Sequence, residues 1–220
     1  MNLLKNKIYG FGFIAITAIV FGVANNSRAQ SRCDNTQTQA DMNGCAIERY
    51  KQADAQLNAA YQRLTYIISP ERKAKLTQAQ LAWIQFRDNQ CLFELTNTRG
   101  GRSNGVEGSM APIIRFSCLK LWTEKRTNDF NQYIQSQLPK PSRNRSLEDL
   151  ERGLNIGYQL ALNNTNLSGE ARNNLQSAQS SWSVFLNLNC QFEATFAAIG
   201  QDLCLRRMAQ ERAEWFTLDP

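Results

Sequence analysis

The chain has 220 residues, a formal net charge of +6 and no histidine. The lack of histidine excludes Ser-His and Cys-His nucleophilic catalysis, histidine-ligated zinc and a histidine pH switch. The positive charge is mild and dispersed, and no cluster of basic residues alternates with aromatic residues, so nucleic acid is not an expected partner.

The first 29 residues have the features of an export signal. Lys5 and Lys7 precede an apolar stretch over residues 8–23, and the small residues Ser27 and Ala29 mark a cleavage site. Removal of this segment takes away three cations and no acid, so the mature chain has 22 cations, 19 acids and a net charge of +3. No later segment reaches the roughly 20 apolar residues that a membrane-spanning helix needs. We therefore expect an exported protein, periplasmic or secreted, with no stable membrane span after signal removal.

One phrase occurs twice in the sequence. LTQAQLAWIQFRDNQC occupies residues 76–91, and LQSAQSSWSVFLNLNC occupies residues 175–190. Further identities lie upstream at an offset of 97 and downstream at an offset of 86, where Arg126 matches Arg212. The chain is therefore a tandem duplication. Around the phrase, seven residues recur at an offset of 99, namely Leu76, Gln80, Trp83, Phe86, Cys91, Phe93 and Glu94 with Leu175, Gln179, Trp182, Phe185, Cys190, Phe192 and Glu193.

The matched residues step by three and four, which is the spacing of one helix face. Helix starts are indicated by Ser69 with Pro70, by Ser146 and by Ser168. Two prolines in the segment 139–145 forbid a continuous helix between the copies. The predicted fold is all-α, a tandem repeat of two small three-helix disulfide-bonded units. The expected boundaries are 1–29 for the signal peptide, 30–138 for the first helical domain, 139–145 for the linker and 146–220 for a degenerate second repeat.

Six cysteines in an exported chain indicate three disulfides. Each copy holds two cysteines at equivalent positions, so we expect a bond within each copy, which leaves the two N-terminal cysteines for each other. A lipid anchor on Cys33 is the alternative, because this residue lies just past the signal, although the residues before it lack the small apolar side chains that lipidation needs. The expected pairs are Cys33–Cys45, Cys91–Cys118 and Cys190–Cys204.

The two copies differ in their polar residues. Copy one has a glycine-rich segment from Arg99 to Gly108, and its bonded cysteines are 27 residues apart against 14 in copy two, so thirteen residues of loop are absent from copy two. Arg87 and Asp88 of copy one are replaced by uncharged residues in copy two. Long polar loops tethered at both ends commonly carry binding. Copy one is therefore the better candidate for function.

Copy one also carries an ordered series of motifs, Asp41-Met42-Asn43-x-Cys45, Ala53-Asp54-x-x-Leu57-Asn58-x-x-Tyr61, Ala79-Gln80-x-x-Trp83-x-x-Phe86-Arg87-Asp88-x-x-Cys91, Gly100-Gly101 and Cys118-x7-Arg126. This series, over about residues 33–135, resembles the LprI-like lysozyme-inhibitor domain family, and a degraded version covers 146–217. The resemblance implies a small helical, disulfide-bonded envelope domain whose named activity is inhibition of lysozyme. Family membership supports a fold more firmly than a function.

Two interpretations of the polar residues stand side by side. In the structural one, Asn58 and Gln80 bond to one another or to the backbone, and Arg126 pairs with Asp88 or Glu94. In the functional one, the loop and the charged pair form a binding surface. The candidate binding residues are then Arg99, Gly100, Gly101, Arg102, Ser103, Arg87 and Asp88.

No nucleophile and no pair of carboxylates is marked in the sequence, so we expect no enzyme and no catalytic residue, metal or cofactor. The predicted function is that of an exported cell-envelope protein that blocks lysozyme or another peptidoglycan-cleaving enzyme by loop insertion. The alternative is a non-inhibitory envelope module that binds cell-wall material or another exported protein.

Overall fold

Six long helices hold most of the residues that the computed structural model describes, which are 33, 38–97, 102–103 and 106–218. The expected export signal lies outside these residues. A short hairpin of two two-residue strands lies between the helices labelled α3 and α4. The elements are α2 (Gln39–Ile67), α3 (Pro70–Asn97), β1 (Arg102–Ser103), β2 (Val106–Glu107), α4 (Ala111–Ile134), α5 (Leu147–Leu162), α6 (Gly169–Glu193) and α7 (Gly200–Leu218).

The helix starts follow the capping signals of the sequence. The Ser146 hydroxyl accepts a hydrogen bond from the backbone N–H of Asp149 at the start of α5, and the Ser168 hydroxyl accepts one from Ala171 at the start of α6. Such a side chain satisfies a backbone donor that the helix itself leaves unpaired. Helix α3 begins at Pro70, whose missing N–H and fixed φ suit the first helical position.

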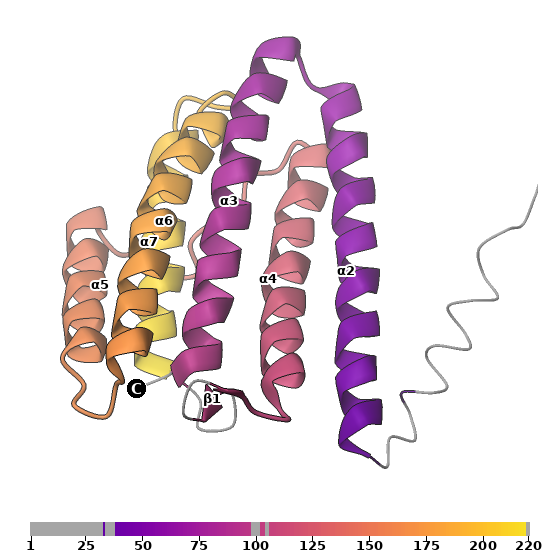
Figure 1. The fold of residues 1–220 in the computed structure, drawn as a ribbon. Helices are drawn as coiled ribbons and strands as arrows, with labels where there is room; N and C mark the ends of the chain where they lie inside the picture. The colour runs from indigo at the N-terminus through magenta and orange to yellow at the C-terminus, as the bar shows by residue number, and fades with distance from the viewer. Residues whose placement is uncertain (1–32, 34–37, 98–101, 104–105, 219–220) are drawn as a thin grey trace, which may run out of the picture.

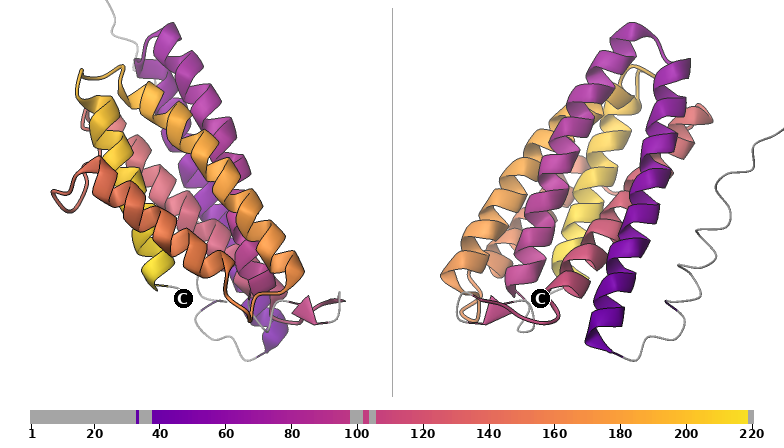
Figure 2. Two further views of the ribbon diagram at one scale, coloured as in Figure 1. Left: turned by 90° about the vertical axis from the view of Figure 1, so that its left-hand side faces the viewer. Right: turned by 45° about the vertical axis from the view of Figure 1, so that its right-hand side comes forward.

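The two copies pack through their middle helices. The most extensive contact of the molecule is between α3 and α6, which lie side by side in the views of Figures 1 and 2. On either side of this pair, α2 packs against α4 and α5 packs against α7. The prediction of an all-α tandem repeat of two three-helix disulfide-bonded units is confirmed. No helix in the described part of the chain is both long and apolar enough to cross a membrane.

The hydrophobic core does not divide between the two repeats. One cluster of buried residues runs from Leu57 of α2 and Trp83 of α3 to Trp182 of α6 and Phe216 of α7. At its centre the rings of Phe86 and its repeat equivalent Phe185 stack with their centroids 6.0 Å apart and their planes 10° from parallel. Each copy therefore supplies part of the other's core, and each alone would expose a large apolar face.

Three disulfides close short stretches of chain, two between the cysteines that the duplication pairs and one between the two N-terminal cysteines that remain. Cys91–Cys118 ties the end of α3 to α4, and Cys190–Cys204 ties α6 to α7. Cys33–Cys45 joins Cys33 to the second turn of α2. By the chain-entropy argument each bond is worth about 3 to 4 kcal/mol.

The segment 139–145 is not helical and lies against α7. The backbone N–H of Arg143 donates to the amide oxygen of Gln210 at 3.2 Å, and the amide nitrogen of Gln210 bonds to the hydroxyl of Ser142. The segment between the copies is thus bound to the second repeat.

Two glycines of α5 give a matched test of helix packing. A Cβ on Gly157 would lie 2.8 Å from Cβ of Phe216, whereas a Cβ on Gly153 would meet nothing within 4 Å. Gly153→Ala should raise the free energy of unfolding by about 0.5 to 1 kcal/mol through helix propensity. Gly157→Ala should instead lower it by about 1 to 3 kcal/mol, because α5 must move away from α7. Chemical denaturation of both variants checks this, and equal effects at the two sites would contradict the close packing.

Candidate functional site

The connection between α3 and α4 is residues 98–110, and its described hairpin lies at one end of the bundle (Figure 1). Strands β1 and β2 pair antiparallel, with Arg102 opposite Glu107 and Ser103 opposite Val106. The Cys91–Cys118 disulfide joins the two helices that flank the connection. The amide of Asn43 on α2 also donates to the backbone oxygen of Ser109 at 3.0 Å. The loop is therefore attached to all three helices of copy one.

The structure describes only some of the candidate loop residues. Arg99, Gly100 and Gly101 lie outside the described residues, and for Arg102 and Ser103 the structure describes the backbone alone. The copy-two connection between α6 and α7 is residues 194–199. The expectation that all thirteen residues missing from copy two are loop is corrected. The connection in copy two is shorter by seven residues, and each of the two helices that flank it is shorter by three residues at the end next to the connection.

Arg87 and Asp88 form a pair on the side of α3. The carboxylate oxygen of Asp88 accepts from Nε and Nη2 of Arg87 at 2.9 and 2.8 Å. The guanidinium of Arg87 is buried and lies 4.9 Å from the ring centroid of Trp83 and 5.9 Å from that of Tyr50. Burial also raises the pKa of the Tyr50 hydroxyl. Only Asp88 is open to solvent, so this pair presents a carboxylate rather than a cation.

The structure does not bring this pair to the loop. Arg87 lies ten residues before the end of α3, which at 1.5 Å per residue is about 15 Å along the helix axis. The described candidate residues thus lie in two places, with Arg87 and Asp88 on the side of α3 and Arg102 and Ser103 on strand β1.

Two expected polar contacts are wrong. Asn58 donates to Asp54 on its own helix at 3.0 Å and not to Gln80. Arg126 bonds to other partners than the expected Asp88 or Glu94, because α4 faces α6 as well as α3. Its Nε donates to Gln80 at 3.0 Å and its Nη1 to Asn189 of the other copy at 2.8 Å.

Arg126 and Arg212 make equivalent contacts, and each donates one hydrogen bond within its own copy and one to the other copy. Arg212 Nε donates to Gln179 of its own copy at 3.0 Å, and its Nη1 donates to Gln90 of copy one at 2.7 Å. Gln179 and Asn189 are the offset-99 equivalents of Gln80 and Gln90. Each arginine also lies over the central phenylalanine of the opposite copy, at 5.1 Å for Phe185 and 5.4 Å for Phe86. The two repeats are therefore related by a local two-fold arrangement, as in a symmetric dimer.

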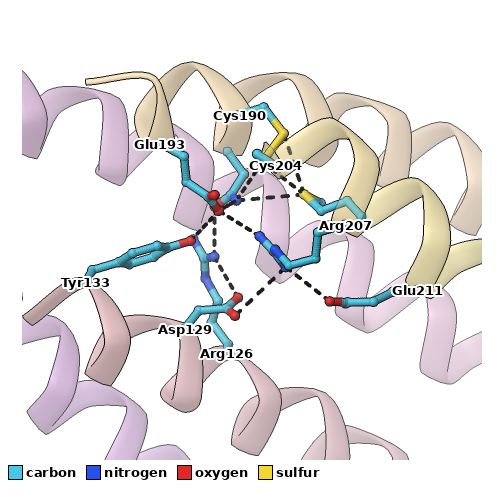
Figure 3. Close-up of a disulfide and its surroundings, with 10 residues drawn as sticks. Arg126, Asp129, Tyr133, Cys190, Glu193, Cys204, Arg207 and Glu211 are labelled. Atoms are coloured by element: carbon cyan, nitrogen blue, oxygen red, sulfur yellow. Dashed lines mark hydrogen bonds and ion pairs between the residues drawn. A yellow bond between two sulfur atoms is a disulfide. The ribbon is translucent and has the colours of Figure 1, made fainter. Parts of the chain in front are cut away.

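A second polar cluster breaks this symmetry (Figure 3). Oε1 of the fully buried Glu193 accepts from the hydroxyl of Tyr133 at 2.6 Å, from Nδ2 of Asn189 at 2.8 Å and from Nη2 of Arg207 at 2.7 Å. Burial raises the pKa of Glu193 against the lowering effect of Arg207, and burial with the Glu193 charge raises that of Tyr133. The offset-86 equivalent of Arg207 in copy one is Leu121, so the repeat gave no sign of this cluster.

These polar clusters are best explained as ties between helices. In the cluster around Glu193 the charged groups bind one another, and this cluster lies beside the Cys190–Cys204 disulfide (Figure 3), whereas Arg126 and Arg212 bind side-chain amides. In the described residues no group of three or more His, Cys, Asp or Glu side chains is arranged to hold a metal ion. The structural interpretation therefore accounts for Gln80, Trp83 and Arg126, and the loop remains as the candidate surface.

Comparison with known proteins agrees with this architecture. The model of the lysozyme inhibitor LprI family matches residues 30–130 and 142–216, one segment for each copy. The chain belongs to the LprI family. An uncharacterised protein of Rhizobium meliloti (strain 1021) is 31% identical over 126 residues, which cover 51% of this chain and 86% of that protein.

A solved structure shares the fold of both copies. The crystal structure of an uncharacterised protein from Burkholderia thailandensis aligns with a TM-score of 0.54 at 17% identity. The alignment covers 88% of this chain and 98% of that one. Because it covers most of the chain, the likeness extends beyond a single repeat.

Proposed function

We propose that this LprI-family protein is an exported inhibitor of lysozyme or a related peptidoglycan-cleaving enzyme, and that it acts through the loop between α3 and α4. The observation that carries the proposal is family membership over both copies together with a long connection in copy one only. Three disulfides suit an oxidising compartment outside the cytoplasm.

The position of the loop supports insertion into a cleft. Lysozyme-type enzymes use a pair of carboxyl groups at the floor of a groove, so an inhibitor must fill the groove and occupy those acids. The hairpin is anchored by the Cys91–Cys118 bond and by Asn43, which lowers the entropy lost on binding. Arg102 and Ser103, on strand β1, offer a cation and a hydroxyl to a carboxylate.

The alternative is a non-inhibitory envelope module that binds cell-wall material or another exported protein. The mild positive charge of the mature chain, +3, gives no long-range attraction to a strongly basic lysozyme, so inhibition must depend on local contact. Sedimentation of the purified protein with insoluble peptidoglycan, in the absence of any lysozyme, distinguishes this alternative.

Charge reversal at the hairpin tests the proposed contact. Arg102→Glu should raise the inhibition constant about thirtyfold, or roughly 2 kcal/mol, because a carboxylate then faces the acids of the enzyme. Lysis of a cell-wall suspension at increasing inhibitor concentration measures the constant. Arg145→Glu in the linker is the charge-matched control and should leave it unchanged. Equal inhibition by the Arg102→Glu and natural proteins would place the contact elsewhere.

A further inference from the structure

A cavity of about 180 Å³ is lined by residues of α3, α4, α6 and α7. Five aromatic side chains line it, and they come from three helices of the two copies. Its polar lining comes from α4 and α7, including the two core arginines Arg126 and Arg212. Lys125 of α4 and Glu211 of α7 also line the cavity and approach one another at 4.0 Å. The aromatic residues are Trp83, Phe86, Trp122, Trp182 and Phe185.

Arg126 and Arg212 both line this cavity, and each has one side-chain donor without a partner. Arg126 and Arg212 are 1% and 2% exposed, and each uses Nε and Nη1 on side-chain amides. Their Nη2 groups are buried and find no acceptor among the residues that the structure describes. The indole N–H of Trp122 at the same cavity is buried and unpaired in the same way. Buried donors of this kind normally have a partner.

The positive charge of the two arginines is poorly balanced. Arg212 donates to two neutral amide oxygens, and burial lowers its pKa to about 9 even though the charge of Glu94 acts in the opposite direction. Arg126 also donates to two amides and has a longer contact, 3.4 Å, with Asp129. The nearby Arg207 is already occupied by Glu193 and Glu211. An anion entering the cavity would gain two charged donors that no protein carboxylate fully satisfies.

We propose that this cavity binds a small organic carboxylate with a flat apolar body, held by Arg126 and Arg212 and packed against the aromatic walls. A guanidinium matches a carboxylate geometrically, and the tryptophan and phenylalanine rings match an apolar body. The volume is adequate, since an engineered apolar cavity of roughly 150 Å³ in another protein holds benzene. The site uses residues of both copies, so it exists only when the two repeats are packed together.

Benzoate is a suitable probe, and the neutral benzamide is its matched control. Calorimetric titration of the full mature protein should show saturable binding of benzoate, and benzoate should raise the thermal midpoint by mass action. Benzamide, which has the same shape without the charge, should bind at least about tenfold more weakly. Equal binding of the two compounds would overturn the assignment of an anion site. So would the absence of benzoate binding at about 20 mM, well above a millimolar dissociation constant.

Three variants locate the site. Arg212→Lys keeps the charge but loses the fork of donors, and should weaken benzoate binding at least about tenfold. Met208→Phe places a bulkier side chain in the cavity and should abolish binding. The protein should stay folded, because the equivalent position of copy one already holds the still larger Trp122. Arg206→Lys, on the same helix but outside the cavity, should change nothing. Unchanged affinity in the first two variants would refute the proposal, and so would chloride binding as tight as that of benzoate.

Discussion

Replacing Arg126 with methionine should lower the free energy of unfolding by about 3 to 5 kcal/mol. The side chain is 1% exposed and donates to Gln80 of its own copy and Asn189 of the other, so its loss removes the donor of a fully buried and of a half-buried amide oxygen. The change also removes a cation that lies 4.6 Å from the ring centroid of Phe130. Urea denaturation followed by circular dichroism measures the loss.

The local two-fold arrangement makes this prediction sharper. Arg212→Met should cost a similar amount, because Arg212 makes the equivalent contacts with Gln179 and Gln90. Arg152→Met is the control, since the Arg152 side chain is 60% exposed and its ion pairs are on the surface. It should change stability by less than about 0.5 kcal/mol. If the Arg126 and Arg152 variants were equally stable, the exchanged hydrogen bonds would not hold the repeats together.

Replacing Glu193 with leucine should also cost about 3 to 5 kcal/mol. The leucine leaves Tyr133 and Asn189 without their acceptor and removes the closest carboxylate of the buried Arg207. Glu193→Gln keeps an acceptor and should cost only about 1 to 2 kcal/mol. The control is Glu94→Leu at the equivalent position of copy one, where the side chain is only half-buried, and its cost should be less than half as large.

The same glutamate gives a pH dependence with a definite sign. The pKa of Glu193 in the folded state lies above its value in the unfolded state. At a pH between these two values the folded protein holds the proton and the unfolded chain does not, so protonation stabilises the folded state. Its contribution is fully present below the unfolded pKa, near 4.3, and declines as the pH rises through the folded pKa. The stability advantage of the natural protein over Glu193→Gln should therefore be larger at pH 4 than at pH 7. An advantage that grows with pH would contradict the raised pKa.

The duplication explains why the fold could be predicted from the sequence and why the hydrogen bonds between the two copies could not. The repeated Leu76, Trp83 and Phe86 marked a helix face, and repeated cysteines indicated which pairs bond. The bond from Arg126 to Asn189 depends on how the two copies dock, and helix periodicity within one copy carries no information about docking. The retention of arginine at 126 and 212 was the available signal, and it was attributed to an ion pair with an acid of the same copy.

The cluster around Glu193 shows a different limit. Arg207 corresponds to leucine in copy one, so comparison of the repeats gave no reason to connect it with Tyr133 or Glu193. The position of the candidate loop also could not be predicted from the sequence. Its composition indicated a binding segment, but its distance along α3 from Arg87 and Asp88 emerged only when the helix was seen to run unbroken to Asn97.

The most direct test of the proposed function is lysozyme inhibition by the mature protein and by a variant in which residues 98–110 are replaced with a six-residue Gly/Ser connection. Six residues is the length of the α6–α7 connection, and it suits neighbouring helices. The natural protein should slow the lysis of cell walls in a saturable way, and the variant, at an unchanged thermal midpoint, should be at least about thirtyfold weaker, as for loss of a central contact. Equal inhibition by both proteins would contradict the loop as the site. No inhibition of either animal or bacterial lysozyme would contradict the proposed function.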